Sequence, residues 1–477
     1  MNPGFPFETS LISYYNGVDY CLGDEKLENV QENKMGVMPV NKLLISMSLP
    51  MMISMLVQAL YNIVDSIFVS RICENALTAV SLAFPLQTLM IGVSIGTCVG
   101  VNAILSKALG AKDQNRANQA ALNGIFLAVL SYVLFLILGL TVVKPFYTSI
   151  TDDPEIVQYG IDYMTIVMTM SFGIFMQTMF ERLLTSTGRT MLTMITQGTG
   201  AIINIILDPI FIFGMFGAPE MGVKGAAVAT VIGQIAAAIF AIILNTTKNK
   251  EIQLSFKGFR PDIKMIKDIY VIAVPSIVMQ CIGSIMNYAM NKILVSFSTT
   301  AVAVFGVYYK LQSFIFMPIF GMNGGVVPII AYNYGAEKKD RLLKTWKLAW
   351  LYSTLIMTVG TILFEVIPST LLRFFDASDY MLEIGVPALR IIGVHFPVAA
   401  FCIITGTLFQ SLGKSVYSMV TSIMRQVVVL LPAAFLLAQL GNVDYVWWSF
   451  PIAEVMSAAA TIFYLIRINR KIISKLK

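Results

Sequence analysis

Apolar segments long enough to form helices follow one another along nearly the whole chain. A helix needs about 20 apolar residues to cross the hydrocarbon core of a bilayer, and segments of that length recur throughout the 477 residues. A transmembrane barrel would instead show alternating segments of about ten residues. Only 13% of the residues are charged, about half the share usual in soluble domains. The sequence therefore predicts an all-α, polytopic membrane protein.

Twelve transmembrane helices are expected. Several are longer than the bilayer requires, which indicates tilted or kinked helices. Their expected ranges are 42–71, 76–108, 119–143, 157–184, 190–214, 223–245, 265–297, 301–334, 345–367, 384–411, 415–438 and 445–466.

The distribution of charge predicts the orientation in the membrane. The longest expected inner loop, 246–264, carries Lys248 and Lys257, whereas the outer loops carry acids such as Asp152 and Asp444. Basic loops stay in the cytoplasm, so we expect a multi-pass protein of the cell inner (plasma) membrane with both termini cytoplasmic. Residues 1–34 are either a short cytosolic tail or precede the true start, and they carry no functional prediction.

The second half of the chain repeats the first at a fixed offset of 225 residues. Two halves with an even number of spans are related by a pseudo-twofold axis along the membrane normal, as in many secondary transporters. The matching pairs include Pro50 and Pro275, Asn62 and Asn287, Gln87 and Gln312, Gly96 and Gly321, Gly110 and Gly335, Arg116 and Arg341, and Gly188 and Gly413.

This repeat predicts the domain organisation. Two six-helix lobes are expected, an N-lobe over 42–245 and a C-lobe over 265–466, joined by a cytoplasmic linker over 246–264. A cytoplasmic tail precedes them over 1–41, and a basic tail follows over 467–477. The repeated basic stretches 110–116 and 335–341 are interpreted as solvated inner loops, because glycine ends a helix and charges face the cytosol.

The first apolar segment carries a polar face. Gln58, Tyr61, Asn62 and Asp65 follow helical spacing and fall on one side of a helix. A carboxylate inside a membrane span is costly unless it faces a wet cavity or finds partners. The four side chains are therefore expected to line a hydrophilic cavity.

A second acid lies at a matching depth in the fifth span. Asn204 and Asp208 share a helix face, and Pro209 cannot donate to the carbonyl of Ile205. Asp65, Asp208 and Thr230 of the sixth span all lie about 9 Å below the outer ends of their helices, at 1.5 Å per residue. Such oxygen ligands suit a hard monovalent cation such as Na⁺, and a close pair of carboxylates could instead hold a proton.

The second half does not repeat these acids. Asp65 corresponds to Met290 and Asp208 to Ala433. Glu181 and Arg182 are expected to form an ion pair at the inner interface. The roles of the ionisable residues in the second half are left open, with snorkelling and a structural histidine as alternatives to function: Lys292, Arg390, His395 and Arg425.

No catalytic or nucleotide-binding motif occurs in the sequence. The chain has one histidine and lacks HExxH, GxSxG and the P-loop pattern. An enzyme is not expected, nor is a cofactor, and an ion gradient is the expected driving force. The net charge of +6 is concentrated at helix ends, so nucleic acid is not expected as a partner.

Several of these segments resemble the multidrug and toxic compound extrusion (MATE) family, and the DinF-like branch in particular. The resemblance covers nearly all of 38–470. It rests on Pro50 with Gln58 to Ser66, Lys107 to Ala111, Leu184 to Arg189, Asn204 to Pro209, and Gly222 to Ala227.

The resemblance implies an exporter of organic, often cationic, compounds in antiport with Na⁺ or H⁺ by alternating access. In similar proteins the first-span aspartate couples transport to the cation, which carries over to Asp65, with Asn204, Asp208 and Thr230 completing the site. Pro50 corresponds to the position where such a helix bends. A second acidic site known in some members is missing here, because Asn287 and Asn291 stand in the seventh span.

The alternative is a flippase for a lipid-linked precursor of the same superfamily. Such relatives usually carry additional spans and a more basic cavity, so twelve spans favour drug export. We expect a monomer surrounded by membrane lipids that binds organic small molecules.

Overall fold

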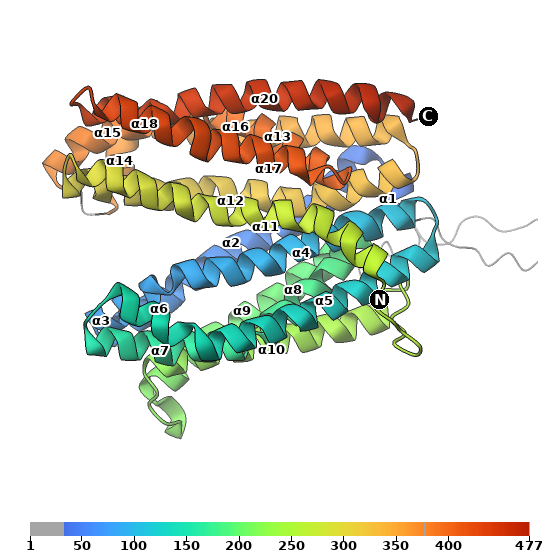
Figure 1. The fold of residues 1–477 in the computed structure, drawn as a ribbon, viewed down its shortest axis with the longest axis horizontal. Coiled ribbons are helices and arrows are strands. Elements are labelled where there is room, and N and C mark those ends of the chain that lie inside the picture. The colour runs from blue at the N-terminus through green and yellow to red at the C-terminus, as the bar shows by residue number, and fades with distance from the viewer. Residues whose placement is uncertain (1–32, 376, 477) are drawn as a thin grey trace, which may run out of the picture. The chain divides into compact units, whose positions relative to one another are not determined.

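The described residues form a bundle of helices. A computed structural model describes residues 33–375 and 377–476, and every regular element in these ranges is helical (Figure 1). The all-α prediction is thereby confirmed. Residues 1–32 of the expected tail lie outside the described part. The described chain begins with one turn, α1 (Lys34–Val37), before the long helix α2 (Val40–Ser70).

Ten helical stretches among the described residues are long and apolar enough to cross a membrane. Two pairs of shorter helices meet the same criterion together: α7 (Pro154–Thr169) meets α8 (Phe172–Ser186) at 45°, and α15 (Asp379–Gly393) meets α16 (Phe396–Ser411) at 47°. Counting each pair once gives up to twelve spans. The ten stretches are α2, α4 (Phe84–Gly110), α5 (Gln114–Thr141), α9 (Thr190–Phe213), α10 (Val223–Lys248), α11 (Ile263–Val295), α12 (Thr299–Gly335), α13 (Lys339–Val366), and the stretches Ser415–Ala438 and Val443–Lys475.

Short helices connect the spans: α3 (Glu74–Leu82), α6 (Val143–Ile150), η1 (Met215–Gly217) and α14 (Pro368–Arg373). The last two spans are divided into several elements, including a π-helical turn, η2. They are α17 (Ser415–Ile423), η2 (Met424–Leu430), α18 (Leu431–Ala438), α19 (Val443–Trp447), α20 (Ser449–Lys471) and η3 (Ile473–Lys475).

The predicted span 76–108 is interrupted, and this boundary was wrong. The chain forms α3 and then α4, with Ala83 between them and Pro85 in the first turn of α4. Proline has no N–H to donate and its ring clashes with the preceding turn, so it favours the start of a new helix. The linker is also shorter than predicted, because α10 continues to Lys248 and α11 begins at Ile263.

The bounds of the helices repeat at the predicted offset of 225 residues. Shifted by that amount, α5 coincides with α13 at both ends, and α9 begins where α17 begins. The bend between α7 and α8 returns between α15 and α16. Sequence repeat and structural repeat therefore describe the same two halves.

Each half has its own apolar core. Phe135 of α5 packs on Phe175 of α8 in the first core, with ring centroids 5.5 Å apart. Phe364 of α13 packs on Phe396 of α16 in the second, at 5.2 Å. In Figure 1 the blue-to-green helices of the first half group below the yellow-to-red helices of the second.

The first helix of each half crosses to the other core. Leu43 and Met47, early in α2, are buried in the C-lobe core, whereas Met265 and Ile269, early in α11, are buried in the N-lobe core. We call the end of the bundle that carries residues 249–262 the linker end and the opposite end the far end. The exchange of helices joins the lobes at the linker end.

Glycines allow the helices of the two lobes to approach closely there. A Cβ added to Gly100 of α4 would lie 2.5 Å from the carbonyl oxygen of Ile269 on α11. Its repeat counterpart, Gly325 of α12, would place a Cβ 2.8 Å from the carbonyl carbon of Met47 on α2. Small residues at helix crossings let backbones touch in this way. Toward the far end, a Cβ on Gly306 of α12 would meet no atom within 4 Å.

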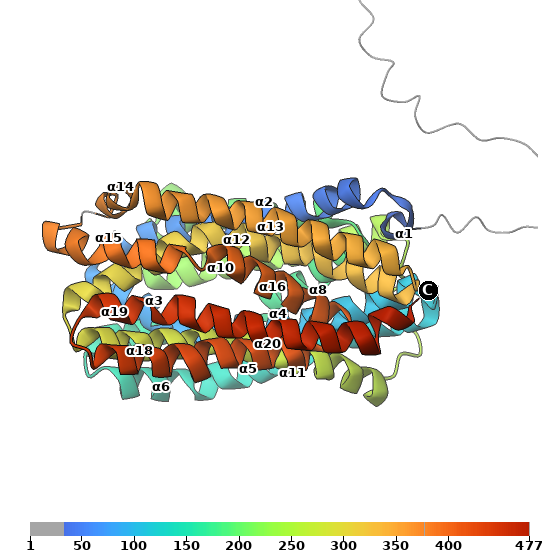
Figure 2. The same ribbon diagram turned by 90° about the horizontal axis from the view of Figure 1, so that it is seen from above.

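The second view agrees with this arrangement. Figure 2 shows α14, α15 and α19 at one end of the bundle and the chain's C-terminus at the opposite end. In Figure 1, α11 and α4 lie beside each other and approach the end that carries the C-terminus. The linker end is therefore where the two lobes are held together.

We predict that Gly100→Ala destabilises the protein whereas Gly306→Ala does not. An added methyl group at Gly100 must displace backbone, and overpacking of this kind costs about 1–3 kcal/mol. At Gly306 there is room, and alanine is the better helix former by up to about 1 kcal/mol. Thermal unfolding of both variants in one detergent checks this. Equal midpoints for the two variants would contradict the proposed contact.

Candidate functional site

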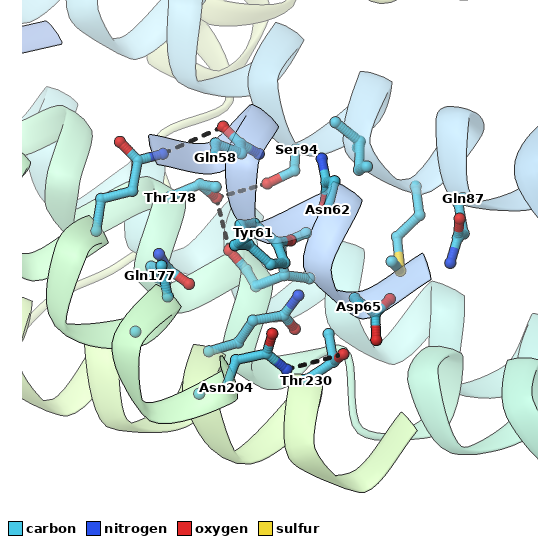
Figure 3. A pocket seen from close by; sticks show the side chains of 18 of the residues that line it. Gln58, Tyr61, Asn62, Asp65, Gln87, Ser94, Gln177, Thr178, Asn204 and Thr230 are labelled. Atoms are coloured by element: carbon cyan, nitrogen blue, oxygen red, sulfur yellow. Dashed lines mark hydrogen bonds between the residues drawn. The ribbon is translucent and has the colours of Figure 1, made fainter. Parts of the chain in front are cut away.

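A cavity of about 600 Å³ lies within the N-lobe. Its wall is built by residues of α2, α3, α4, α7, α8, α9 and α10. Figure 3 shows polar side chains from several of these helices around one space. The cavity is lined by both polar and apolar groups, as is usual for sites that bind organic molecules.

The polar face of α2 forms one side of this cavity. Gln58, Tyr61, Asn62 and Asp65 all line it, as Figure 3 shows. Helical spacing puts the four residues on one side of α2. Gln58 is held in place by the Gln197 side chain of α9, whose Nε2 donates to Gln58 Oε1 at 3.3 Å.

Asn204, Asp208 and Thr230 are joined by hydrogen bonds. The amide Nδ2 of Asn204 donates to Asp208 Oδ1 and to Thr230 Oγ1, both at 3.3 Å. Asn204 and Thr230 line the same cavity as Asp65, whereas Asp208 lies fully buried one helical turn along α9. The structure thus brings together the residues that matching depth placed at one level.

Three oxygen atoms in this group accept no hydrogen bond in the described structure. They are Asp65 Oδ1, Asn204 Oδ1 and Asp208 Oδ2, and all three are buried. A buried polar atom without a partner costs roughly 1–3 kcal/mol, and more when it is charged. Carboxylate and amide oxygens suit a hard cation such as Na⁺, and protonation would equally remove the buried charge. The residues present therefore fit a monovalent cation or a proton.

Pro50 lies inside α2, which continues without a break from Val40 to Ser70. Proline cannot donate to the carbonyl four residues earlier, here that of Ser46. The hydroxyl of Thr190, at the start of α9, donates to this carbonyl at 3.4 Å. Pro50 therefore marks a point where α2 depends on a neighbouring helix for a hydrogen bond.

The sequence did not predict several cavity residues. Gln87 of α4 donates to the Tyr163 hydroxyl at 3.1 Å, and Ser94 and Thr178 share a hydrogen bond of 2.5 Å. Gln87 had served only as a marker of the repeat. The available signal was that each of these polar residues stands alone in an apolar span. The sequence does not show which side of each helix faces the cavity, so the residues could not be assigned to it.

Glu181 corrects one expectation. The sequence placed it in an interfacial ion pair with Arg182, yet no such pair occurs among the described residues. Glu181 is buried in the cavity wall, where its Oε1 accepts from Gln177 at 3.0 Å and from Thr196 at 3.2 Å. Neighbouring helix residues point in different directions, so adjacency in sequence did not bring the two charges together.

The C-lobe shows no matching pair of acids. Met290 is completely buried in the C-lobe core, and Asn291 donates to Asn287 at 3.0 Å. Arg425 lies in the π-helical turn and donates to the buried Glu454 at 3.3 Å.

The other ionisable residues of the C-lobe have local partners. Lys292 lies 5.8 Å from the centroid of the Tyr288 ring, and the exposed Arg390 donates to the carbonyl of Glu365 at 3.3 Å. His395 is buried and stacks with Phe450. None of these three side chains faces the N-lobe cavity.

Comparison with known proteins gives a consistent result. The sequence model described as MatE matches residues 50–210 and again 275–436, once in each half. The multidrug export protein MepA of Staphylococcus haemolyticus (strain JCSC1435) is 26% identical over 459 residues, covering 94% of this chain and 98% of that protein. MepA of Staphylococcus aureus (strain bovine RF122 / ET3-1) is 27% identical over 439 residues, covering 90% and 94%.

A solved structure has the same fold. It is described as the outward-facing conformation of a multidrug resistance MATE family transporter, and it matches with a TM-score of 0.86 at 24% identity. The match covers 92% of this chain and 98% of that one.

Repeat, fold and relatives together define a multi-pass membrane transporter and not an enzyme. The chain belongs to the MatE family, the multidrug and toxic compound extrusion transporters. The resemblance to the MATE family identified from the sequence is thereby confirmed.

We predict that Na⁺ or acid stabilises the wild-type protein and that Asp208→Asn abolishes much of this effect. A ligand at a hundredfold excess over its dissociation constant adds about 2.7 kcal/mol of stability. The variant removes a buried carboxylate, so it should also unfold at a higher temperature when no cation is added. Thermal unfolding with and without Na⁺, at neutral and mildly acidic pH, measures both effects. An unchanged response in the variant would exclude Asp208 from the site.

Proposed function

We propose that this protein is a secondary active exporter of organic, often cationic, compounds in antiport with Na⁺ or H⁺. Asp65, Asn204, Asp208 and Thr230 bind the coupling cation, and Gln58, Tyr61 and Asn62 line the part of the cavity that receives substrate. The observation that carries this proposal is that one N-lobe cavity is lined by residues of both groups, with unpartnered oxygens of Asp65 and Asn204 in its wall.

The chemistry of the cavity supports an organic cation as substrate. Asp65 and Glu181 are acids in its wall, and Tyr61 and Tyr163 supply aromatic rings. Positive charge is attracted both to carboxylates and to the faces of aromatic rings. Methionines 51, 55 and 90 add adaptable apolar surface.

The packing of the lobes supports alternating access. They touch through backbone at the linker end, where Gly100 meets Ile269 and Gly325 meets Met47. We propose that the linker end faces the cytoplasm of a cell whose plasma membrane holds the protein as a monomer. The described conformation is then closed toward the cytoplasm, and a second conformation would open that end.

Coupling follows if cation and substrate favour different conformations. A ligand with equal affinity for both states shifts neither population. Asp65 lies on the same helix face as the residues assigned to substrate, one turn or two away. An organic cation near Asn62 would therefore compete with Na⁺ or H⁺ for the charge of Asp65.

The flippase alternative is not favoured. A lipid phosphate would need several basic side chains, but Arg182 is the one base among the described residues that line this cavity, which also carries the acids Asp65 and Glu181. The relatives with the multidrug names also match along nearly their whole length.

We predict that Asp65→Asn abolishes gradient-driven export while the protein remains folded in the membrane. The amide keeps the size of the side chain but cannot exchange a proton or neutralise a cation. The measurement is uptake of a fluorescent organic cation into inside-out proteoliposomes with an imposed Na⁺ or H⁺ gradient, which also identifies the coupling ion.

Asp444→Asn is the matched control, because it removes one carboxylate from α19, away from the cavity. It should transport at the wild-type rate. Wild-type transport by Asp65→Asn, with either gradient, would refute the assignment.

A further inference from the structure

A second cavity lies between the two lobes at the linker end. Its volume is about 360 Å³, and both lobes contribute to its wall. Lys107 and Arg116 come from the N-lobe, and Asp268, Tyr334 and Lys414 come from the C-lobe. The proposed export function makes no use of it.

Basic side chains outnumber acids in this cavity, and the acids are already engaged. The Asp113 carboxylate caps α5 by accepting from the N–H of Arg116 at 2.9 Å. The Asp268 carboxylate accepts from the Arg116 guanidinium at 3.1 Å. Lys107 lies over the Tyr334 ring, 4.7 Å from its centroid. Among the described residues no carboxylate forms an ion pair with Lys107 or Lys414.

The pseudo-twofold axis relates this cavity to a region of the other half in which the corresponding basic side chains have hydrogen-bond or ion-pair partners. At the offset of 225 residues, Arg116 corresponds to Arg341 and Lys414 to Arg189. Arg341 donates to the carbonyls of Met35 at 3.1 Å and Met38 at 2.7 Å. Arg189 is paired with Glu251 at 3.0 Å.

The segment 33–38 fills that related place. The Lys338 ammonium donates to the Gly36 carbonyl at 3.0 Å, and Asn33 donates to the Thr187 carbonyl of the N-lobe at 3.0 Å. Met35 is completely buried there. Carbonyl oxygens of this short segment thus accept from basic groups of the C-lobe, and its Asn33 amide donates to the N-lobe.

The corresponding segment, 258–263, takes another path. Phe259 packs on Phe126 of α5 with ring centroids 6.4 Å apart, and the N–H of Asp262 donates to Asn123 at 3.0 Å. Within 33–375 and 377–476, no oxygen atom therefore accepts a hydrogen bond from the ammonium group of Lys107 or Lys414. The space that segment 33–38 fills on one side of the axis stays open on the other.

We propose that this cavity binds a phosphate-bearing anion through Lys107, Arg116 and Lys414. Several donors that converge from two lobes suit a group with several charged oxygens. The cavity is larger than a phosphate group, so it has room for an organic group attached to the phosphate. The ligand is either the headgroup of an anionic phospholipid of the same leaflet or a free phosphate compound.

The site depends on the conformation of the transporter. Its donors come from both lobes, so the anion binds best when the linker end is closed. Bound anion therefore stabilises the conformation described here and slows the opening of this end. Basic pockets at the cytoplasmic side of membrane helices commonly take lipid headgroups.

The test measures binding to the full chain, separately from transport. Protein from phosphatidylcholine vesicles with and without phosphatidylglycerol is analysed by native mass spectrometry for retained phosphatidylglycerol. In phosphatidylcholine alone, radiolabelled inorganic phosphate is the soluble probe. We predict that Lys107→Gln with Lys414→Gln weakens binding at least about tenfold, because one charge-assisted hydrogen bond contributes that factor.

Two further double variants complete the design. Lys107→Arg with Lys414→Arg retains the donors and should restore binding. Lys112→Gln with Lys344→Gln removes the same charge from exposed positions outside the cavity wall and should bind as wild type.

Each outcome decides the proposal. Loss of phosphatidylglycerol only in the Lys107→Gln, Lys414→Gln variant supports a lipid ligand, and the same pattern with inorganic phosphate supports a soluble one. If neither probe distinguishes that variant from wild type, or if the exposed control loses binding equally, the site is refuted. Thermal midpoints close to wild type confirm that the variants are folded.

Discussion

Backbone contact between helices of opposite lobes is the constraint on which the rest of this structure depends. Gly100 lets α4 touch α11, and Gly325 lets α12 touch α2. In a membrane, where lipid tails are as apolar as leucine, such close packing supplies the attraction between helices. Because both contacts lie at the linker end, the lobes are held together there. Lys107 and Lys414 line one cavity at this same end of the bundle.

Helix α2 connects this contact to the candidate site. Its first turns, around Met47, are buried in the C-lobe core, and its last turns carry Asp65 in the N-lobe cavity. Pro50 lies between the two regions, at a point where the hydrogen bond within the helix is replaced by one from Thr190. A change of charge at Asp65 therefore acts on a helix that belongs to both lobes. This is the physical basis of the coupling that we propose.

Much of this arrangement follows from sequence, and the remainder depends on packing. The recurring apolar segments predicted the helices and spans, and the 225-residue repeat predicted the two related halves. Both patterns can be recognised in the sequence without knowledge of how the helices pack. Spacing put Gln58 and Asp65 on one face of a helix. Equal depth placed Asp208 and Thr230 at one level, and in the structure Asn204 donates hydrogen bonds to both. The role of Glu181 and the break at Ala83 were missed, since they depend on neighbouring helices and on Pro85. The cavity between the lobes at the linker end could not be predicted from sequence either. It exists because residues 258–263 take a different path from that of the corresponding segment 33–38.

The central claim is that substrate and coupling cation exclude one another at Asp65. It is tested most directly by titrating the purified transporter with tetraphenylphosphonium. Bound radiolabelled Na⁺ is measured during the titration, and proton release is measured in the same titration in Na⁺-free buffer. The account predicts that the organic cation displaces Na⁺ or releases a proton from the wild type, and that Asp65→Asn shows neither response. Binding of tetraphenylphosphonium with the bound Na⁺ and protons unchanged would contradict it.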